Sequence, residues 1–147
     1  MRRRQLGVTL VETAVVILLF FSLVFAIIEF GRAYNMFHSI TNAARAGARY
    51  SVAPCSYNVA TCGTATAGQM MDPTAVASVV KQWLAAANID PNGKDVVVTV
   101  QQSQNENINA VNQSYTHVHV EAPYSFFFLP FDTVTLKSDA VMRNETN

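Results

Sequence analysis

The chain has 147 residues, of which 50% are hydrophobic and only 14% are charged, and its formal net charge at pH 7 is zero. This length leaves room for about one small domain beside a membrane segment. The charges are unevenly spread: Arg2, Arg3 and Arg4 begin the chain without an acidic residue nearby, whereas four basic and eight acidic residues from residue 51 onward give a net charge of −4 there. Nucleic-acid binding needs a clustered cationic surface, so this acidic part excludes a nucleic-acid partner.

Residues 8–28 are the most apolar part of the chain. The polar residues in this run are Thr9, Glu12, Thr13 and Ser22. As a helix the run is about 32 Å long, enough to cross a hydrocarbon core of about 30 Å. Arginines precede the run and only Arg32 follows closely, so the positive-inside rule places the N-terminus in the cytoplasm. The sequence therefore predicts a single-pass transmembrane helix with an exported head.

A short basic leader, MRRRQLG, ends at Gly7. Cleavage after Gly7 would make Val8 the first residue and Glu12 the fifth, a register that is similar to that of type IV prepilins. An acid at mid-membrane costs on the order of 2–3 kcal/mol, though less near the interface, and the amine freed on Val8 of a neighbouring subunit can offset this cost by pairing with Glu12. The pattern predicts a processing site and an inter-subunit charge pair. The alternative is an unprocessed signal anchor.

The helix is expected to continue beyond the membrane to about residue 51, because no proline occurs before Pro54. This continuation would protrude by about 34 Å. One mainly apolar stripe, predicted to be covered, consists of Phe30, Tyr34, Phe37, Thr41, Ala44 and Ala48. Two pairs with small-xxx-small spacing allow close backbone approach, namely Ala43 with Gly47 and Ala44 with Ala48. A helix, or the sheet of the chain's own head, is expected to dock there.

Three features follow one another in this part of the chain: an acid at the start of the apolar span, the motif EFGR at 29–32 and the block NAARAGAR at 42–49. In this order, within VETAVVILLFFSLVFAIIEFGRAYNMF and TNAARAGARY, they resemble the TadE-like pseudopilins (minor pilins) of tight-adherence (Tad or Flp-type) pilus systems. The resemblance covers roughly residues 7–53. The positions assigned to a helix-packing motif are Glu29, Phe30, Gly31, Arg32, Asn42, Ala43, Ala44, Arg45, Gly47 and Arg49.

The resemblance implies a role in pilus assembly, adhesion or secretion, through helix bundling with other pilin-like subunits. It implies cleavage by a prepilin peptidase, and Gly7, Val8 and Glu12 carry over directly as the matching positions. Further implied partners are other Tad pilins or pseudopilins, the inner-membrane assembly platform and membrane lipid. The implied location is the bacterial inner membrane with a periplasmic head, and the resemblance leaves open whether the subunit enters the extracellular pilus.

Two cysteines, Cys55 and Cys62, lie in the segment CSYNVATC on the exported side of the membrane, where disulfides persist. A bond between them would close a short ring and contribute roughly 2.5 kcal/mol in the chain-entropy model. Two free thiols are the alternative. A metal site is disfavoured because the spacing is not CxxC and no second cluster accompanies it.

A second helix is predicted over residues 73–88. Asp72 is a suitable N-cap, and Pro73 suits the first helical position. Apolar residues at helical spacing are Val76, Val79, Val80, Trp83, Leu84 and Ala87, and this pattern predicts that Trp83 belongs to the core. Residues 90–93, DPNG, predict a turn.

Three strands are predicted at residues 95–102, 115–121 and 133–142. The polar residues 103–114 are expected to be weakly structured, and SFFFLPF at 125–131 is either a buried connection or an exposed patch that faces membrane or partner, with Pro130 arguing against a central strand. The predicted fold is α+β and pilin-like, with an antiparallel sheet packed on the long helix. The predicted parts are the leader 1–7, the transmembrane helix 8–28, its extracytoplasmic continuation 29–53 and the head 54–147.

His117, His119 and Glu121 are expected on one face of the second strand, a spacing that permits metal binding. A solvated strand face is the favoured interpretation, so we expect no metal and no cofactor. No motif of a catalytic nucleophile or acid–base pair occurs, and the protein is expected not to be an enzyme. The competing hypotheses are an unprocessed, signal-anchored module that binds an extracytoplasmic ligand and a metal-dependent exported enzyme that uses His117 and His119.

Overall fold

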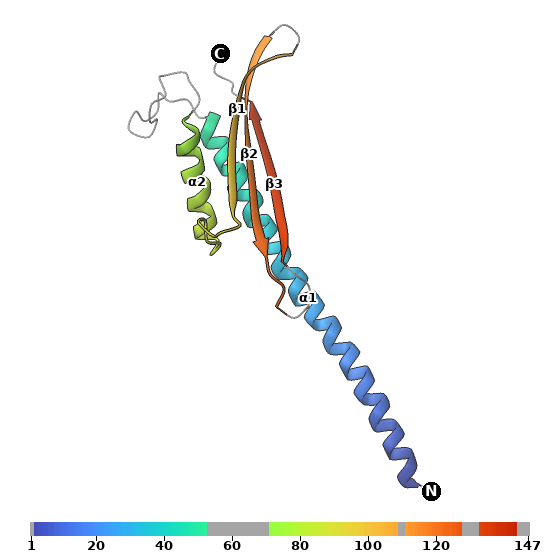
Figure 1. Cartoon of the computed structure of the whole chain (residues 1–147). Helices are drawn as coiled ribbons and strands as arrows, with labels where there is room; N and C mark the ends of the chain where they lie inside the picture. The colour runs from blue at the N-terminus through green and yellow to red at the C-terminus, as the bar shows by residue number, and fades with distance from the viewer. Residues whose placement is uncertain (1, 53–70, 109–110, 128–132, 144–147) are drawn as a thin grey trace.

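The computed structural model of the protein describes residues 2–52, 71–108, 111–127 and 133–143. Its elements, in chain order, are α1 (Arg2–Val52), α2 (Pro73–Ala86), β1 (Val97–Ile108), β2 (Val111–Tyr124) and β3 (Val134–Arg143). The strands form one antiparallel sheet in the order β1-β2-β3. Figure 1 shows that the sheet and α2 pack on the C-terminal half of α1, while its N-terminal half extends away from the head. The α+β, pilin-like prediction is confirmed.

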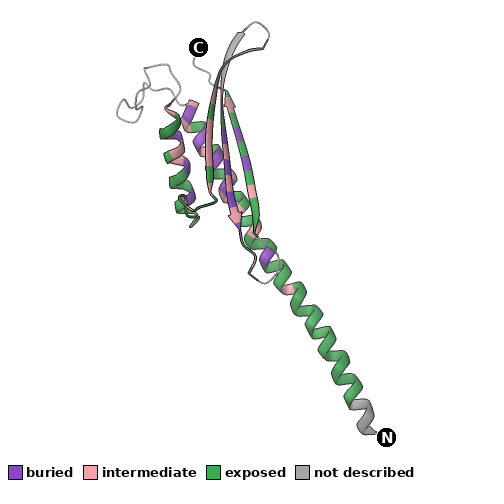
Figure 2. Ribbon diagram, in the orientation of Figure 1, coloured by how far each residue is buried: buried purple, intermediate pink, exposed green. Residues whose placement is uncertain are grey.

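The helix α1 is one continuous rod because its sequence contains no proline. Among the described residues it is the one helix long and apolar enough to cross a membrane, and its apolar window is wholly exposed within the molecule. Figure 2 shows this as an exposed N-terminal half followed by a C-terminal half that is buried on one side. A single-pass membrane anchor is consistent with this arrangement, since lipid would cover the exposed apolar surface.

The helix α2 begins at the predicted cap. Asp72 Oδ1 accepts hydrogen bonds from the Thr74 N–H at 2.8 Å and from the Thr74 hydroxyl at 2.6 Å, and Pro73 occupies the first turn. The helix ends at Ala86, two residues before the predicted end, and Asn88 adopts a positive φ of 61° just beyond it. The turn predicted at 90–93 is present, with the Gly93 N–H donating to the Asp90 carbonyl oxygen at 3.2 Å.

The prediction that Trp83 belongs to the core is wrong, because 52% of this residue is exposed. Only one row of α2, at Val76, Val80 and Leu84, is fully buried. The small residues of α1 let α2 approach closely, so the contact between the two helices involves one narrow row of α2. Trp83 lies outside this row. Ala87, also on the predicted apolar stripe, is exposed for the same reason.

The hairpin of β1 and β2 is longer than predicted. The backbone of residues 103–114 was expected to be weakly structured, yet the strands run through Ile108 and resume at Val111, with a register shift between Ser103 and Glu106. Ladder hydrogen bonds are made by the backbone and tolerate polar side chains, so the pairing continues beyond the apolar part of both strands. Residues 109–110 are outside the described part.

Pro123 lies in the central strand β2, where a missing N–H would ordinarily break the ladder. The first residue of β1, Val97, is opposite Glu121, so β1 does not extend as far as Pro123. On its other side Pro123 is opposite Thr135 of β3. The strand β2 is therefore locally an edge strand at Pro123, and the sequence places proline where one neighbour is absent.

The core lies between the inner face of the sheet, α2 and one side of α1. Its buried apolar residues are Ile40, Ala43, Ala44, Ala48, Met71, Val76, Val80, Leu84, Val118, Val120, Ala122 and Ala140. Even-numbered residues of β2 point inward, as period-two alternation requires. The small-xxx-small residues of α1 are thus buried against the chain's own α2 and sheet.

The predicted apolar stripe of α1 is covered only at its far end. Ala44 and Ala48 are buried, whereas Phe30, Tyr34 and Phe37 remain 73%, 56% and 42% exposed. The described part of the head packs on a neighbouring face of the helix and leaves these three aromatic residues exposed. They form an exposed face that continues from the apolar N-terminal half of α1, with Phe30 and Tyr34 stacked at a centroid distance of 6.3 Å.

Gly47→Ala tests the close packing of α1 against α2. A Cβ at Gly47 would lie 2.3 Å from Val80 Cγ2, and Val80 is fully buried and stiff, so overpacking should destabilise the head by about 1–3 kcal/mol despite the better helix propensity of alanine. Gly31→Ala is the matched control, because its Cβ meets nothing within 4 Å. Thermal melting of the full chain in detergent should show a loss for Gly47→Ala alone; equal melting of both variants would contradict the packing.

Candidate functional site

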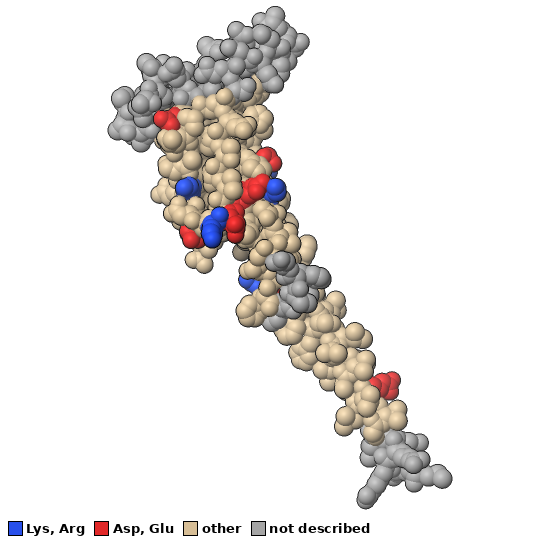
Figure 3. Space-filling view, viewed as in Figure 1, with Lys and Arg blue, Asp and Glu red and all other residues tan. Residues whose placement is uncertain are grey.

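The predicted processing site lies in an exposed, helical part of α1. Gly7 is inside the helix, and a Cβ built on it meets nothing within 4 Å. Val8 is 69% exposed, and Glu12 one turn later is exposed too. On the face drawn in Figure 3, one acidic group lies among uncharged atoms on the described part of the N-terminal half of α1, whereas the head carries several charged groups.

Glu12 makes no hydrogen bond or ion pair with any side chain that the structure describes. Its neighbours are satisfied locally, since the Thr13 hydroxyl donates to the Thr9 carbonyl oxygen at 2.8 Å. A carboxylate on an apolar, membrane-length helix is costly without a counterion. The geometry leaves Glu12 available to a charge on another molecule.

A second carboxylate, Glu29, is deeply buried where the head meets α1, which we call the stalk. It is only 1% exposed, and it accepts hydrogen bonds from the Tyr124 hydroxyl at 2.6 Å and the Phe127 N–H at 3.2 Å. Arg32, one turn along α1, donates to both carboxylate oxygens at 3.3 Å. We call these four residues the head–stalk junction.

The donors of the junction fix the ionisation of Glu29. The Tyr124 hydroxyl, the Phe127 N–H and Arg32 together hold the pKa of Glu29 below its ordinary value, against the opposing effect of burial. Burial and the neighbouring Glu29 carboxylate raise the pKa of the Tyr124 hydroxyl, which therefore stays a donor. The Arg32 guanidinium also lies 5.8 Å from the centre of the Tyr124 ring.

The local sequence explains how these groups meet. Tyr124 is the last residue of β2 and has the inward parity of Val118, Val120 and Ala122. Glu29 begins the face of α1 that later carries the core. Sequence reasoning missed Tyr124 and Phe127 as partners; the available signal was an acid directly after an apolar span, which requires donors, and an aromatic hydroxyl at the inward end of a strand.

The remaining residues of the EFGR motif point elsewhere. Phe30 is exposed, and a Cβ at Gly31 would meet nothing within 4 Å. The motif therefore splits into two polar residues that hold the head and two that face outward. Within the described part of the chain Glu29 and Arg32 contact the head, and the helix-packing role assigned to all four residues stays a prediction.

The block at 42–49 divides in the same way. Ala43, Ala44 and Gly47 are buried in the core, whereas the three polar residues of the block are exposed on the opposite side. These are Asn42, Arg45 and Arg49, which border a hollow of about 640 Å³ that Trp83 and Tyr50 also line. Within the described part of the chain neither arginine makes an ion pair.

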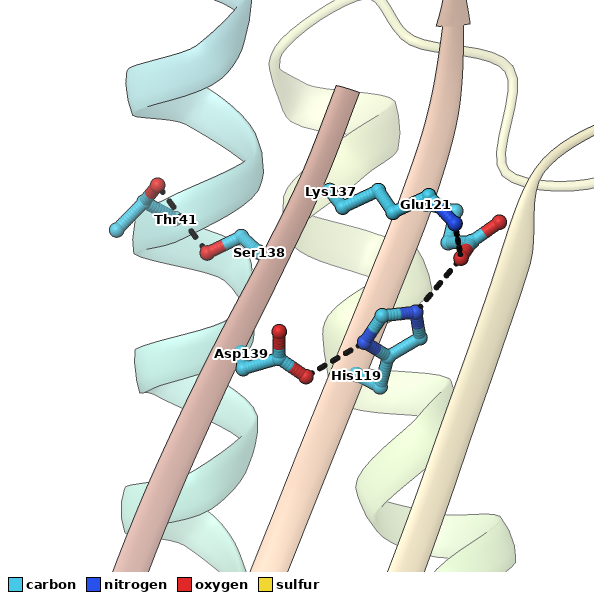
Figure 4. A network of polar contacts seen from close by, with 6 residues as sticks. All are labelled: Thr41, His119, Glu121, Lys137, Ser138 and Asp139. Carbon is cyan, nitrogen blue, oxygen red and sulfur yellow. Dashed lines mark hydrogen bonds and ion pairs between the residues drawn. The ribbon is translucent and has the colours of Figure 1, made fainter. Parts of the chain in front are cut away.

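The outer face of the sheet carries a network centred on His119 (Figure 4). The ring places Nδ1 2.5 Å from Asp139 Oδ1 and Nε2 2.9 Å from Glu121 Oε1, and Lys137 Nζ donates to the same Glu121 oxygen at 2.6 Å. The Glu121 carboxylate, and then that of Asp139, raise the pKa of His119. The network links β2 to β3 through side chains that lie directly opposite each other.

His117 and His119 share the outer face as predicted, but they are not arranged as metal ligands. Both ring nitrogens of His119 face carboxylates, and His117 is exposed outside the network. No group of three or more histidine, cysteine, aspartate or glutamate residues able to hold a metal occurs among the described residues. The predicted disulfide partners Cys55 and Cys62 lie outside those residues.

The pH dependence of the junction provides a test. Because the folded-state pKa of Glu29 is lowered, its contribution to stability is present above its unfolded pKa and is lost as the pH falls through the folded value. Tyr124→Phe should lower the melting temperature at neutral pH by several degrees. It should also reduce the further fall in melting temperature as the pH is lowered. Glu29→Gln should abolish that part of the acid dependence.

Melting curves of the full chain in detergent from neutral pH to about pH 3 measure both effects. Phe30→Leu, at an exposed position beside Glu29, is the control and should follow the wild type. An unchanged acid profile in Glu29→Gln would show that Glu29 does not hold the head on the stalk.

The family model described as TadE-like protein matches residues 7–49. The match includes Glu12, EFGR and NAARAGAR, and it follows α1 almost to its end while leaving out the head. It confirms the resemblance inferred from the sequence over these residues. Comparisons with curated proteins and with solved structures gave no match.

Proposed function

We propose that this TadE-like chain is a pseudopilin, or minor pilin, of a Tad (Flp-type) pilus assembly and secretion system, cleaved after Gly7 and acting by helix bundling. The observation that carries the proposal is the exposed N-terminal half of α1. It is apolar, long enough to span a membrane, bare of head contacts and marked by a carboxylate without a described partner. This half lies within the stretch that matches the family.

Charge pairing supplies the assembly mechanism. Cleavage leaves a free amine on Val8, and Glu12 lies four residues along the helix, which is about 6 Å. A neighbouring subunit shifted by about that distance brings its own amine level with this carboxylate. Inside a helix bundle of low dielectric constant, the pair offsets the desolvation cost of both charges. Cleavage also removes three arginines that tether the helix to the cytoplasmic face.

The structure also limits which surface is available for bundling. Ala43, Ala44 and Gly47 are covered by the chain's own head, so they cannot serve a second subunit without unfolding it. The exposed apolar surface of α1 lies at residues 8–28 and at the aromatic face of Phe30, Tyr34 and Phe37. We therefore assign the bundling contacts to residues 8–28 and to the face of Phe30, Tyr34 and Phe37.

The proposal places the protein in the bacterial inner membrane, with the N-terminus in the cytoplasm and the head in the periplasm. Its partners are the prepilin peptidase, other Tad pilins or pseudopilins, the assembly platform and membrane lipid. The support is the apolar α1 with its basic start and the family match, which together favour these partners over a soluble ligand.

Intact mass and N-terminal sequencing test the processing step. Protein from cells with the cognate prepilin peptidase should lack MRRRQLG and begin at Val8, and protein from cells without it should be full length. Gly7→Val is a useful variant, because a Cβ at this position meets nothing within 4 Å and a block of cleavage therefore reports on the peptidase. An intact leader in both strains would favour the unprocessed, ligand-binding module.

Glu12→Ala tests the charge pair. Membrane insertion should be unchanged or better, because removing an acid lowers the cost of the span by up to about 2–3 kcal/mol, while assembly should be strongly impaired. Thr13→Ala, at the next exposed position, is the matched control. Membrane fractionation and counting of pili measure the two effects, and normal piliation in Glu12→Ala would refute the pairing mechanism.

A further inference from the structure

Residues 125–127, the described part of the connection that follows β2, are held at a defined height along α1. The Phe127 N–H donates to Glu29 Oε1 at 3.2 Å, and the Tyr124 hydroxyl donates to the same oxygen at 2.6 Å. The backbone carbonyl oxygen of Glu29 also accepts a hydrogen bond from the Tyr124 hydroxyl, at 3.2 Å. Figure 1 shows this connection at the end of the head nearest the N-terminal half of α1.

The height of Glu29 along α1 coincides with the surface of the membrane. The proposed span ends at Ile28, so Glu29 lies only about 1.5 Å farther along the helix axis. The polar interfacial layer extends about 5–7 Å beyond the hydrocarbon core on each side. Phe127, hydrogen-bonded to Glu29, therefore falls within this layer rather than in bulk water.

The side chains at this height have the chemistry of a bilayer interface. Phe127 is 76% exposed, and Phe30 on α1, next to Glu29, is 73% exposed. Phe126 packs edge-on against Tyr124 at a centroid distance of 5.2 Å, which orients the connection. The side chain of Arg32 is 51% exposed, so it reaches water or headgroups while it pairs with Glu29.

We propose that in the unassembled, membrane-anchored chain Phe127, together with Phe30, inserts into the interfacial layer of the phospholipid bilayer, giving the head a lipid contact of its own beside the transmembrane helix. The inference rests on the proposed membrane span. Lipid is the occupant because the height of Phe127 is set by its hydrogen bond to the first residue beyond the span, and exposed Phe side chains are buried favourably at the boundary between headgroups and acyl chains.

The contact explains why the junction is so completely satisfied. A lone carboxylate in the interfacial layer is costly, and the head brings a hydroxyl and an N–H to it. With Phe127 in the lipid and Glu29 held by the connection, the head lies close against the membrane. The lipid contact thereby restricts how far the head can tilt relative to α1 on the side of Phe127.

Depth-dependent quenching of tryptophan fluorescence tests the contact. Trp83 is the chain's one tryptophan, so the probe is Phe127→Trp in a full chain that also carries Trp83→Phe. The protein is reconstituted into phosphatidylcholine–phosphatidylglycerol vesicles whose acyl chains are brominated close to the headgroup. We expect blue-shifted emission and a clear loss of intensity relative to vesicles without bromine.

Two matched probes make the result decisive. The native Trp83 is 52% exposed and lines a hollow with residues of α1 from Asn42 to Tyr50, about 21–33 Å beyond the end of the span, so its emission should not be quenched. Phe20→Trp in the Trp83→Phe background lies inside the span and should be quenched by bromine placed deep in the acyl chain. Ser125→Trp, at an exposed position of the same connection, replaces Phe127→Trp if that variant misfolds.

The probes separate this contact from the proposed function. Quenching of Phe20→Trp without quenching at the connection would overturn the lipid contact and leave the membrane anchor intact. Absence of quenching at Phe20→Trp would overturn both. Since neither peptidase nor other pilins are present in the vesicles, processing and assembly do not influence the readout.

Discussion

The structure depends on the buried Glu29 carboxylate at the point where α1 passes from its exposed apolar half into the head. Its donors come from its own helix, through Arg32, and from the end of β2 and the residues after it, through Tyr124 and Phe127. An acid next to an apolar span needs such partners, because neither lipid nor a dry core can solvate it. The pairing determines how far down the stalk the head extends, and with it the height of every strand.

Above this junction, α1 serves as the central support of the head. Its small residues permit α2 to approach so closely that Gly47 has no room for a methyl group beside Val80. This close packing uses one side of the helix and leaves the arginines of the 42–49 block on the other. The same helix therefore provides an exposed apolar half, the junction and a core element at successive heights, with a different side-chain chemistry at each.

This division by height is consistent with a pilin-like role. The half of α1 that would enter a bundle is free of contacts with the head, so subunits can pack together there without disturbing the fold. The head is stabilised by its own core and by the cross-strand network around His119. That network satisfies its charged groups internally and supports a structural role for this face of the sheet.

The sequence determined the elements whose signals are local: the apolar run of α1, the Asp72–Pro73 start of α2, and strands with alternating or β-branched residues. The resemblance in α1 was readable because it lies in contiguous residues. Tertiary structure alone decided how the helices are rotated against each other, which exposes Trp83 and Phe30, and how far backbone pairing extends through the polar residues 103–114. It also decided the partners of Glu29, which lie about a hundred positions away in the sequence. Such contacts depend on strand register and on the rotation of the helix, and neither can be read from the residues around Glu29 alone.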